Sequence, residues 1–240
     1  MPDTSQSAPS GAPTLVAVAH GTRDPAGVAA VEALLHRVRA LRPGLAARLA
    51  FLEVAPPSVG DSVTDITGSI VVLPLLLASG YHAGTDVPRS VAAAWVHAAA
   101  EEVRIGAVLG PDPLLARALL DRLREAGWRR GDAVVLGAAG SSDPAAARAT
   151  EAQATLLANL VGAPVVPAYA SAVEPSADEA VAGLRAAGAG RVALASYLLA
   201  PGHFQSRLAA AGADVLSDPL GSHEAVARLV LARYDDALRQ

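Results

Sequence analysis

The chain has 240 residues, of which 52% are hydrophobic and 18% charged, and it contains no cysteine. This composition excludes an intrinsically disordered chain, and the lack of cysteine excludes disulfides, thiolate metal sites and iron–sulfur clusters. The net charge of −4 gives no general attraction to nucleic acid or to anionic lipid, so we expect no nucleic-acid partner. All 19 basic residues are arginine, which excludes chemistry that needs a lysine, such as Schiff-base formation.

The beginning of the chain predicts neither a signal peptide nor a membrane anchor. Residues 1–13 contain no basic residue and no apolar stretch, so we expect a flexible leader. The most apolar stretch, residues 70–78, has the length of a buried strand and is too short for the roughly 20 residues of a membrane span. We therefore expect no membrane partner and a location in the cytoplasm.

Short apolar stretches alternate with longer helical patterns along the rest of the chain. Stretches that are apolar throughout are typical of parallel strands covered on both faces. Asp24 and Asp143 each precede a proline and indicate helix starts, because aspartate caps a helix and proline suits its first turn. This order predicts an α/β fold of parallel sheets flanked by helices. The predicted strands are residues 15–19, 49–54, 70–77, 103–108, 133–138, 164–169, 192–198 and 213–216, and the predicted helices include 26–41, 113–126, 145–160 and 176–187.

The two halves of the chain resemble each other at three landmarks. Landmarks at a nearly constant offset indicate an internal duplication. We expect a half-domain over residues 14–127 that carries the active site, and a degenerate half-domain over residues 128–240. The matching landmarks are VAVAHGTRDP at 16–25 with VLGAAGSSDP at 135–144 (offset 119), Pro57-Ser58 with Pro175-Ser176 (offset 118), and His82 with His203 (offset 121).

Three side chains that can bind a metal or move a proton follow consecutive strands of the first half. His20 comes directly after the first predicted strand, Glu53 lies in the last part of the second, and His82 follows the third. In an open parallel sheet, ligands bind at the carboxyl ends of the strands. Two imidazoles and a carboxylate suit a divalent transition metal, and histidine exchanges protons near neutral pH. The sequence therefore predicts a metal-binding or proton-transfer site at this edge.

Ordinary structural roles also account for single members of this set. A histidine beside a glycine can serve a turn, and Glu53 can cap a helix or pair with an arginine. His36 and His97 fall within helical patterns, where surface or packing roles are expected, and His223 is expected to start the last helix. The convergence of three such groups after consecutive strands favours the functional interpretation.

The second half has lost most of this set. Ala139 stands at the place of His20 and Ser171 at the place of Glu53, whereas His203 repeats His82. One half therefore needs the chemistry, and we expect the other to serve as a scaffold or as a wall that covers the substrate.

The motifs of the first half, in this order, resemble the sirohydrochlorin chelatase family, whose members insert iron or cobalt in siroheme and cobalamin synthesis. The resemblance covers residues 14 to about 235 and implies two flavodoxin-like half-domains around a cleft, in an ATP-independent, lyase-type chelatase. It implies that His20 and His82 bind the metal and accept protons and that Glu53 assists them. The motifs are AHGTRDP at 19–25, FLE at 51–53 with Pro57-Ser58, and LPLLLASGYH at 73–82 with DVP at 86–88.

The implied reaction sets the expected cofactors and partners. The divalent metal is a substrate, and no further cofactor is expected. Sirohydrochlorin is a polycarboxylate, so we expect contacts from Arg23, Arg89, His203 and Arg207. We expect iron and siroheme, with cobalt insertion for cobalamin synthesis as the alternative, and a monomer, since the duplication supplies the cleft within one chain. Thr22 departs mildly from the family, where serine is usual.

Other functions fit these residues less well. A histidine phosphatase or mutase would need an arginine directly before the nucleophilic histidine, but Ala19 precedes His20. A dinucleotide-binding enzyme would need a glycine-rich turn after the first strand, which is missing. A carrier that binds tetrapyrrole or metal without inserting it stays an alternative, and release of a metallated product would distinguish it from an enzyme.

Overall fold

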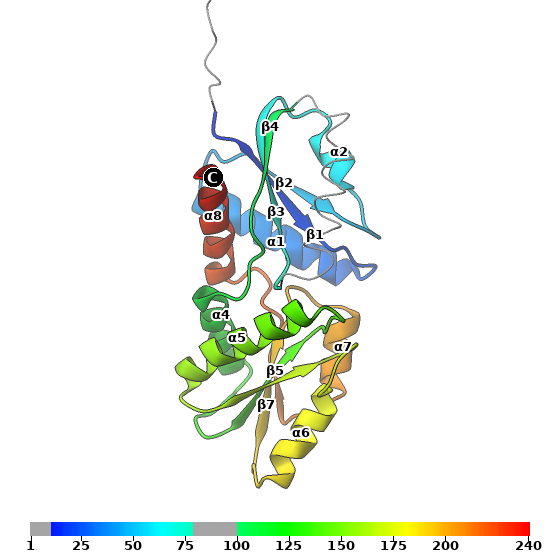
Figure 1. Ribbon diagram of the computed structural model, residues 1–240, viewed down its shortest axis with the longest axis vertical. Helices are drawn as coiled ribbons and strands as arrows, with labels where there is room; N and C mark the ends of the chain where they lie inside the picture. The colour runs from blue at the N-terminus through cyan, green and yellow to red at the C-terminus, as the bar shows by residue number, and fades with distance from the viewer. Residues whose placement is uncertain (1–10, 79–99) are drawn as a thin grey trace, which may run out of the picture.

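The computed structural model describes residues 11–78 and 100–240 and has an α/β fold with two parallel four-stranded sheets, one above the other in Figure 1. The first sheet has the order β2-β1-β3-β4 and the second β6-β5-β7-β8, which confirms the predicted fold class. The strands are β1 (Thr14–Ala19), β2 (Ala47–Phe51), β3 (Gly68–Pro74), β4 (Ala100–Ile105), β5 (Ala133–Ala138), β6 (Val165–Tyr169), β7 (Val192–Tyr197) and β8 (Val215–Leu216).

The strand pattern of the sequence reflects burial on both faces of each sheet. Residues 15–18 of β1 are fully buried, and every residue of β7 is buried. Each predicted strand overlaps an observed one, but some bounds differ. The third predicted strand continues to residue 77, whereas β3 ends at Pro74, with the Leu75 N–H still donating to the Val18 carbonyl oxygen of β1 at 2.8 Å. The apolar residues 75–77 instead line cavities at the edge of the sheet.

Aspartate caps begin the first helix of each half, as predicted. The Asp24 side chain accepts a hydrogen bond of 2.9 Å from the Ala26 N–H, and the Asp143 side chain accepts one of 2.8 Å from the Ala145 N–H. Each cap satisfies an N–H that the helix itself leaves without a partner. The described helices are α1 (Pro25–Leu41), α2 (Val59–Val63), α4 (Pro113–Glu125), α5 (Pro144–Val161), α6 (Ala177–Ala186), α7 (His203–Ala209) and α8 (Glu224–Leu238).

The two halves exchange one helix each. Helix α4 follows the first sheet in the chain but packs on α5 and β7, whereas α8 ends the chain and packs on α1 and β3 (Figure 1). One cluster of buried apolar side chains therefore runs through both halves. The boundary between residues 127 and 128 stays a prediction about the sequence repeat. Helix α4 lies before this boundary and packs on the second half, and α8 lies after it and packs on the first half.

A polar network holds the exchanged helices together. Arg233 on α8 donates to the Asp112 carboxylate at 2.9 Å and to the carbonyl oxygens of Val108 and Leu109 at 3.0 Å. Asp112 caps α4, and its backbone N–H donates at 2.9 Å to the fully buried Gln153 of α5. Such a largely buried network, with its donors and acceptors matched, fixes the relative position of three helices more than it adds stability.

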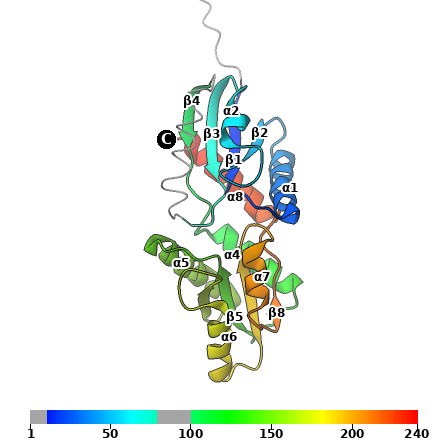
Figure 2. The ribbon, with the colours of Figure 1, turned by 90° about the vertical axis from the view of Figure 1, so that its right-hand side faces the viewer.

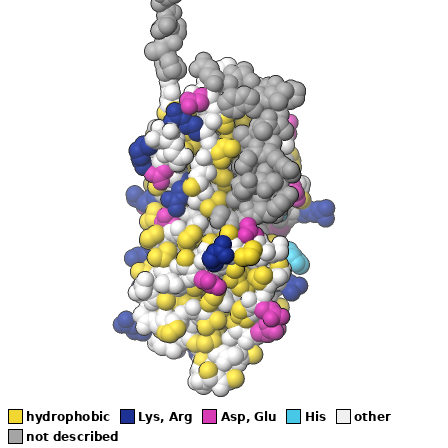
Figure 3. Space-filling model, in the orientation of Figure 1, with side chains coloured by type: hydrophobic (Ala, Val, Ile, Leu, Met, Phe, Trp, Pro, Cys, Tyr) yellow, Lys and Arg dark blue, Asp and Glu magenta, His cyan; other side chains and the backbone are white. Residues whose placement is uncertain are grey.

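The described surface is mixed in charge. On the face drawn in Figure 3, arginine side chains are interspersed with acidic ones among small apolar patches. Several charged side chains of the described residues are paired, for example Arg42 with Asp235 and Arg48 with Asp65. In the part of the chain that the structure describes, no helix has both the length and the apolar character that crossing a bilayer requires.

Candidate functional site at the cleft between the sheets

A cavity of about 310 Å³ opens where the carboxyl ends of the two sheets meet. One wall comes from the loop after β1, which carries His20, together with Phe51 and Leu75 at the ends of β2 and β3. The other wall comes from residues 198–204, the loop after β7 and the first residues of α7. The cavity therefore belongs to both halves of the chain.

The loops after β1 and β2 are held against each other through their backbones. The Glu53 N–H donates to the His20 carbonyl oxygen at 3.1 Å. Gly21 has a φ of +105°, and a Cβ atom there would lie 1.9 Å from the Glu53 carbonyl oxygen, so a larger residue does not fit. This contact brings two of the predicted site residues together, and the side chains of both His20 and Glu53 are exposed at this edge.

The predicted place of Glu53 within the second strand is wrong, because β2 ends at Phe51. The chain reverses in a tight turn, where the Ala55 N–H donates to the Glu53 carbonyl oxygen at 2.7 Å and Val54 has a φ of +69°. Positive φ at a β-branched residue costs roughly 1–3 kcal/mol, and such strain gathers at functional sites. The hydrophobic pattern of the sequence does not indicate this turn.

The second half has the same backbone turn, but it lacks the histidine and the glutamate of the first half. The Val173 N–H donates to the Ser171 carbonyl oxygen at 2.9 Å around Ala172, which has a φ of +70°. A Cβ atom at Gly140 would lie 1.8 Å from the same carbonyl oxygen. Where the first half has an imidazole and a carboxylate, the Ser171 hydroxyl donates to the Ala139 carbonyl oxygen at 2.9 Å. The hydroxyl thus ties the two loops together.

The opposite wall of the cavity rests directly on the first half. The Pro201 carbonyl oxygen would lie 2.8 Å from a Cβ atom at Gly27 in α1, and both views show the start of α1 next to this loop (Figures 1 and 2). His203 and Phe204 line the cavity, and their rings make an edge-to-face contact with centroids 5.7 Å apart and an interplanar angle of 61°. The structure therefore brings His203 to the same cavity as His20.

The remaining predicted residues fall into two groups. His82 and Arg89 lie outside the described residues. Arg23, just before α1, and Arg207, on α7, are both exposed, and neither lines the cavity. They belong to segments that flank the two walls, one from each half of the chain.

The described side chains do not by themselves form a metal cage. Over residues 11–78 and 100–240, no three His, Asp or Glu side chains lie close enough to hold a metal ion. His20, Glu53 and His203 are therefore not a preformed three-ligand set. The predicted set of His20, Glu53 and His82 stays a prediction, because His82 is not among the described residues.

A second cavity, of about 240 Å³, is the counterpart of the first under the internal repeat. It lies between residues 75–78 of the first half and residues 138–141 of the second. None of the described residues that line it carries an imidazole or a carboxylate, so it offers no comparable chemistry. Its polar side chains are hydroxyl-bearing, from Ser141, Thr150, Tyr169 and Tyr197.

Three residues at the cleft were not predicted from the sequence. Phe204 had a usable signal, because it directly follows a repeated histidine in a chain with only 3% aromatic residues. Gly27 and Tyr197 had none, since each matters through contact with the other half, and no local pattern reports such a contact.

Comparison with known proteins identifies the family of this chain. A family model described as CbiX matches residues 14–126 and 133–237, one match in each half. The chain is 26% identical over 229 residues to a protein of Priestia megaterium named sirohydrochlorin ferrochelatase. That alignment covers 89% of this chain and 86% of the relative.

Two solved structures share the fold. "SirB from Bacillus subtilis with Fe3+" superimposes with a TM-score of 0.78 at 24% identity, over 93% of this chain and 94% of that one. The sirohydrochlorin chelatase SirB from Bacillus subtilis subspecies spizizenii, in complex with cobalt, superimposes with a TM-score of 0.76 at 23% identity, over 94% and 95%. At these identities the likeness shows that the two-sheet architecture is shared along nearly the whole chain.

Proposed function

The chain belongs to the CbiX family, and from this premise we propose that it is a sirohydrochlorin chelatase that inserts ferrous iron into sirohydrochlorin to give siroheme. The enzyme is a metal chelatase of the lyase type. The observation that carries the proposal is the cavity with His20 on one wall and the second half of the chain on the other. In this proposal a flat macrocycle binds between the two walls, with its metal-binding centre facing an imidazole.

The proposed chemistry is an exchange of protons for a metal ion. Insertion replaces two pyrrole N–H protons with one divalent ion, so the site must present the ion and take up the protons. We assign metal binding and proton acceptance to His20 and His82 as neutral imidazoles, with Glu53 as the assisting carboxylate. The backbone contact between His20 and Glu53 supports this pairing, because it keeps both side chains at one edge of the sheet.

The proposed substrate contacts come from both halves. Arg23, Arg89 and Arg207 would bind carboxylates of sirohydrochlorin by charge-assisted hydrogen bonds, and His203 would contact the substrate inside the cavity. The exposure of Arg23 and Arg207 beside opposite walls supports these roles. Carboxylates at the edge of the macrocycle would meet them while its centre faces His20.

Cobalt is the alternative metal, since imidazole and carboxylate ligands accept either ion and the solved relatives are described with Fe3+ and with cobalt. A carrier that binds tetrapyrrole or metal without inserting it is the alternative to an enzyme. The independence from ATP, the monomeric state and the cytoplasmic location remain predictions from the sequence.

An anaerobic assay of metal insertion tests the proposed function. Sirohydrochlorin is mixed with ferrous or cobaltous ion, and the absorbance shift on metallation is followed for the parent and for His20→Ala, His82→Ala and His36→Ala. His36 is exposed on α1 and does not line the cavity, so its variant is a matched control. We expect His20→Ala and His82→Ala each to lose about 100-fold or more in rate, the scale of acid–base catalysis, and His36→Ala to keep the parental rate.

The outcomes separate the alternatives. A higher rate with iron supports siroheme synthesis, and a higher rate with cobalt replaces it with the cobalamin alternative. Tetrapyrrole binding without any rate above the uncatalysed background would leave a carrier. Equal losses in all three histidine variants would show a general effect on the fold and would remove the assignment of the site.

A further inference from the structure

We propose that Phe204, positioned by His203, forms an aromatic wall from the second half of the chain on which the conjugated macrocycle stacks opposite His20. The inference rests on the proposed function, because it names the far wall of the same cavity. It gives the degenerate half a role in substrate binding, through a residue without an equivalent in the first half. In the first half the aromatic residue precedes the histidine, as Tyr81-His82, whereas Phe204 follows His203 in the second.

The exposure of Phe204 is the first observation. The chain has two phenylalanines, and Phe51 is 2% exposed in the core, whereas Phe204 is 37% exposed. Because Phe204 lines the cavity and does not pack in the core, part of its ring is open to a ligand that enters there. The other large apolar side chains found exposed among the described residues, Val54, Ile105 and Leu160, do not line this cavity.

The edge-to-face contact with His203 is the second observation. Its centroid distance of 5.7 Å and angle of 61° are those of a favourable aromatic pair, which limits the orientations open to an exposed ring. The contact is local, between adjacent residues at the start of α7, so it does not depend on the rest of the core. A ring that is already oriented loses little freedom when a ligand stacks on it.

The third observation is that this wall is fixed relative to the first half. A Cβ atom at Gly27 would lie 2.8 Å from the Pro201 carbonyl oxygen, and a Cβ atom at Gly202 would lie 3.6 Å from Thr22 Oγ1. The loop that carries the aromatic pair therefore sits against α1 and against the loop that carries His20. The spacing between the two walls is set by packing, which suits a flat ligand of fixed thickness.

The chemistry of the cavity favours a conjugated ring over other ligands. Apart from the two histidines and Thr22, its lining is formed by apolar side chains and glycines, so it offers few partners for a small polar molecule. A macrocycle with charged groups at its edge places the apolar ring inside, where it contacts Phe204, and the carboxylates outside. Stacking on an aromatic side chain makes binding about 2- to 10-fold tighter than contact area alone provides.

Binding of metal-free sirohydrochlorin tests the wall apart from catalysis. The tetrapyrrole is titrated into the parent, Phe204→Ala, Phe204→Trp and Leu160→Ala, and the Kd is read from the absorbance change. Leu160 on α5 is 45% exposed and does not line the cavity, so its variant controls for the loss of an exposed apolar side chain. We expect a Kd about tenfold higher for Phe204→Ala and a parental Kd for Phe204→Trp and Leu160→Ala.

Turnover and His203 variants complete the test. Phe204→Ala should raise the KM for sirohydrochlorin and leave kcat within about twofold, since the wall binds the ring and moves no proton. His203→Ala should raise the Kd, and His203→Phe should restore it, because a second aromatic ring keeps the edge contact. A loss of kcat in His203→Phe would overturn the positioning role and assign His203 to the chemistry.

Failure of the inference and failure of the proposed function give different results. If the parent binds and metallates sirohydrochlorin and Phe204→Ala binds it equally well, the wall is overturned and the chelatase stands. If the parent binds no sirohydrochlorin, the proposed function fails, and the inference fails with it. Melting temperatures of all variants are measured first, and binding is compared only among variants that are folded at the assay temperature.

Discussion

The phenol hydroxyl of Tyr197, at the end of β7, donates a hydrogen bond of 2.7 Å to the carbonyl oxygen of Leu77, in the loop after β3. The bond joins the two halves of the chain at the edge of the cleft. Tyr197 is 2% exposed, and burial, helped by the nearby Asp112 carboxylate, raises the pKa of its phenol far above the usual value. The group therefore stays protonated and keeps donating to Leu77 at neutral pH and well above it.

Removal of this hydroxyl should destabilise the protein. Tyr197→Phe leaves the Leu77 carbonyl without its partner, and we expect a loss of about 1 kcal/mol in the free energy of unfolding, measured by urea denaturation. Tyr169→Phe is the control, because the Tyr169 hydroxyl forms no hydrogen bond with another described residue although its side chain is also buried. Equal stabilities for the two variants would show that the bond between the halves contributes nothing.

The close approach at Gly27 predicts an unusual response to alanine in a helix. Gly27→Ala places a Cβ atom within 3 Å of the Pro201 carbonyl oxygen, so α1 and the loop after β7 must separate. We expect a loss of roughly 1–3 kcal/mol in the free energy of unfolding and a weaker substrate affinity, since the cavity walls shift. Gly183→Ala in α6 meets no atom within 4 Å and should instead stabilise the protein by about 0.5–1 kcal/mol. A gain in stability for Gly27→Ala, measured in the same denaturation series, would contradict the close approach.

The internal repeat places equivalent aspartate caps at Asp24 and Asp143, so the effects of removing them can be compared. Asp24→Ala and Asp143→Ala each remove the side-chain acceptor at the start of α1 or α5, and each should cost about 1 kcal/mol of unfolding free energy. Only Asp24 follows the loop that carries His20, so only Asp24→Ala should also lower the rate of metal insertion. Equal rate losses in both variants would mean that the loop after β5 takes part in the reaction.

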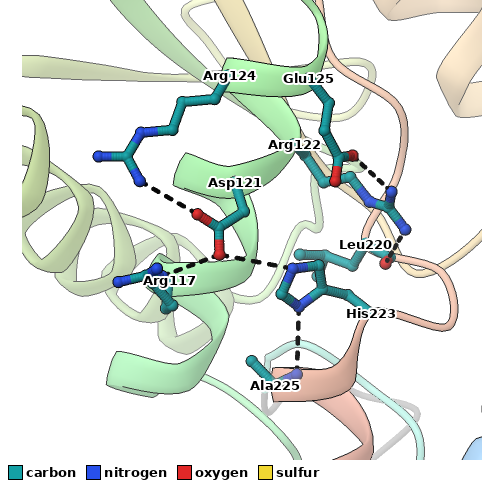
Figure 4. A network of polar contacts seen from close by, with 8 residues as sticks. All are labelled: Arg117, Asp121, Arg122, Arg124, Glu125, Leu220, His223 and Ala225. Carbon is teal, nitrogen blue, oxygen red and sulfur yellow. Dashed lines mark hydrogen bonds and ion pairs between the residues drawn. The ribbon is translucent and has the colours of Figure 1, made fainter.

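His223 links the exchanged helices, and its pKa is expected to make the stability of the protein depend on pH. Its Nδ1 atom accepts a hydrogen bond of 3.2 Å from the Ala225 N–H and caps α8, while its Nε2 atom lies 3.7 Å from an Asp121 carboxylate oxygen on α4 (Figure 4). Burial, followed by the nearby Arg122, lowers the pKa of His223, and the carboxylates of Asp121 and Glu125 oppose this effect only in part. The lowered pKa favours the neutral imidazole, which the cap requires.

The lowered pKa predicts which way stability changes with pH. Between the folded pKa and the usual value of about 6.5 the unfolded chain binds more protons, so the contribution of His223 is fully present above about pH 6.5 and is lost as the pH falls through the folded pKa. His223→Asn keeps a capping acceptor and does not titrate. The stability of the parent minus that of His223→Asn should therefore decrease between about pH 7.5 and pH 5, measured by urea denaturation at each pH. A difference that is constant with pH would contradict the pKa shift, because the other titrating groups are common to both proteins.

Much of the fold could be read from the sequence because its signals are local. The strands are apolar throughout since both faces of each sheet are covered, and the Asp-Pro pairs mark helix starts because the caps satisfy N–H groups within two residues. The predicted strand bounds are less accurate at β3, which ends at Pro74 inside an apolar stretch, and at Glu53, which lies in a strained turn beyond β2. Neither proline at a strand end nor a positive φ changes the hydrophobic pattern.

By itself the sequence determined the α/β architecture, the duplication and the place of His20 directly after a strand. These follow from periodicity, capping and repeated motifs, which act over a few residues or recur at a fixed offset. Only the tertiary structure decided that His203 and Phe204 share a cavity with His20, and that α4 and α8 pack on the opposite halves. The cavity and the packing of α8 on α1 join residues more than a hundred positions apart, and close contacts such as that of Gly27 with Pro201 hold them together. Such contacts depend on how two finished halves fit together, and no pattern along the chain encodes that fit.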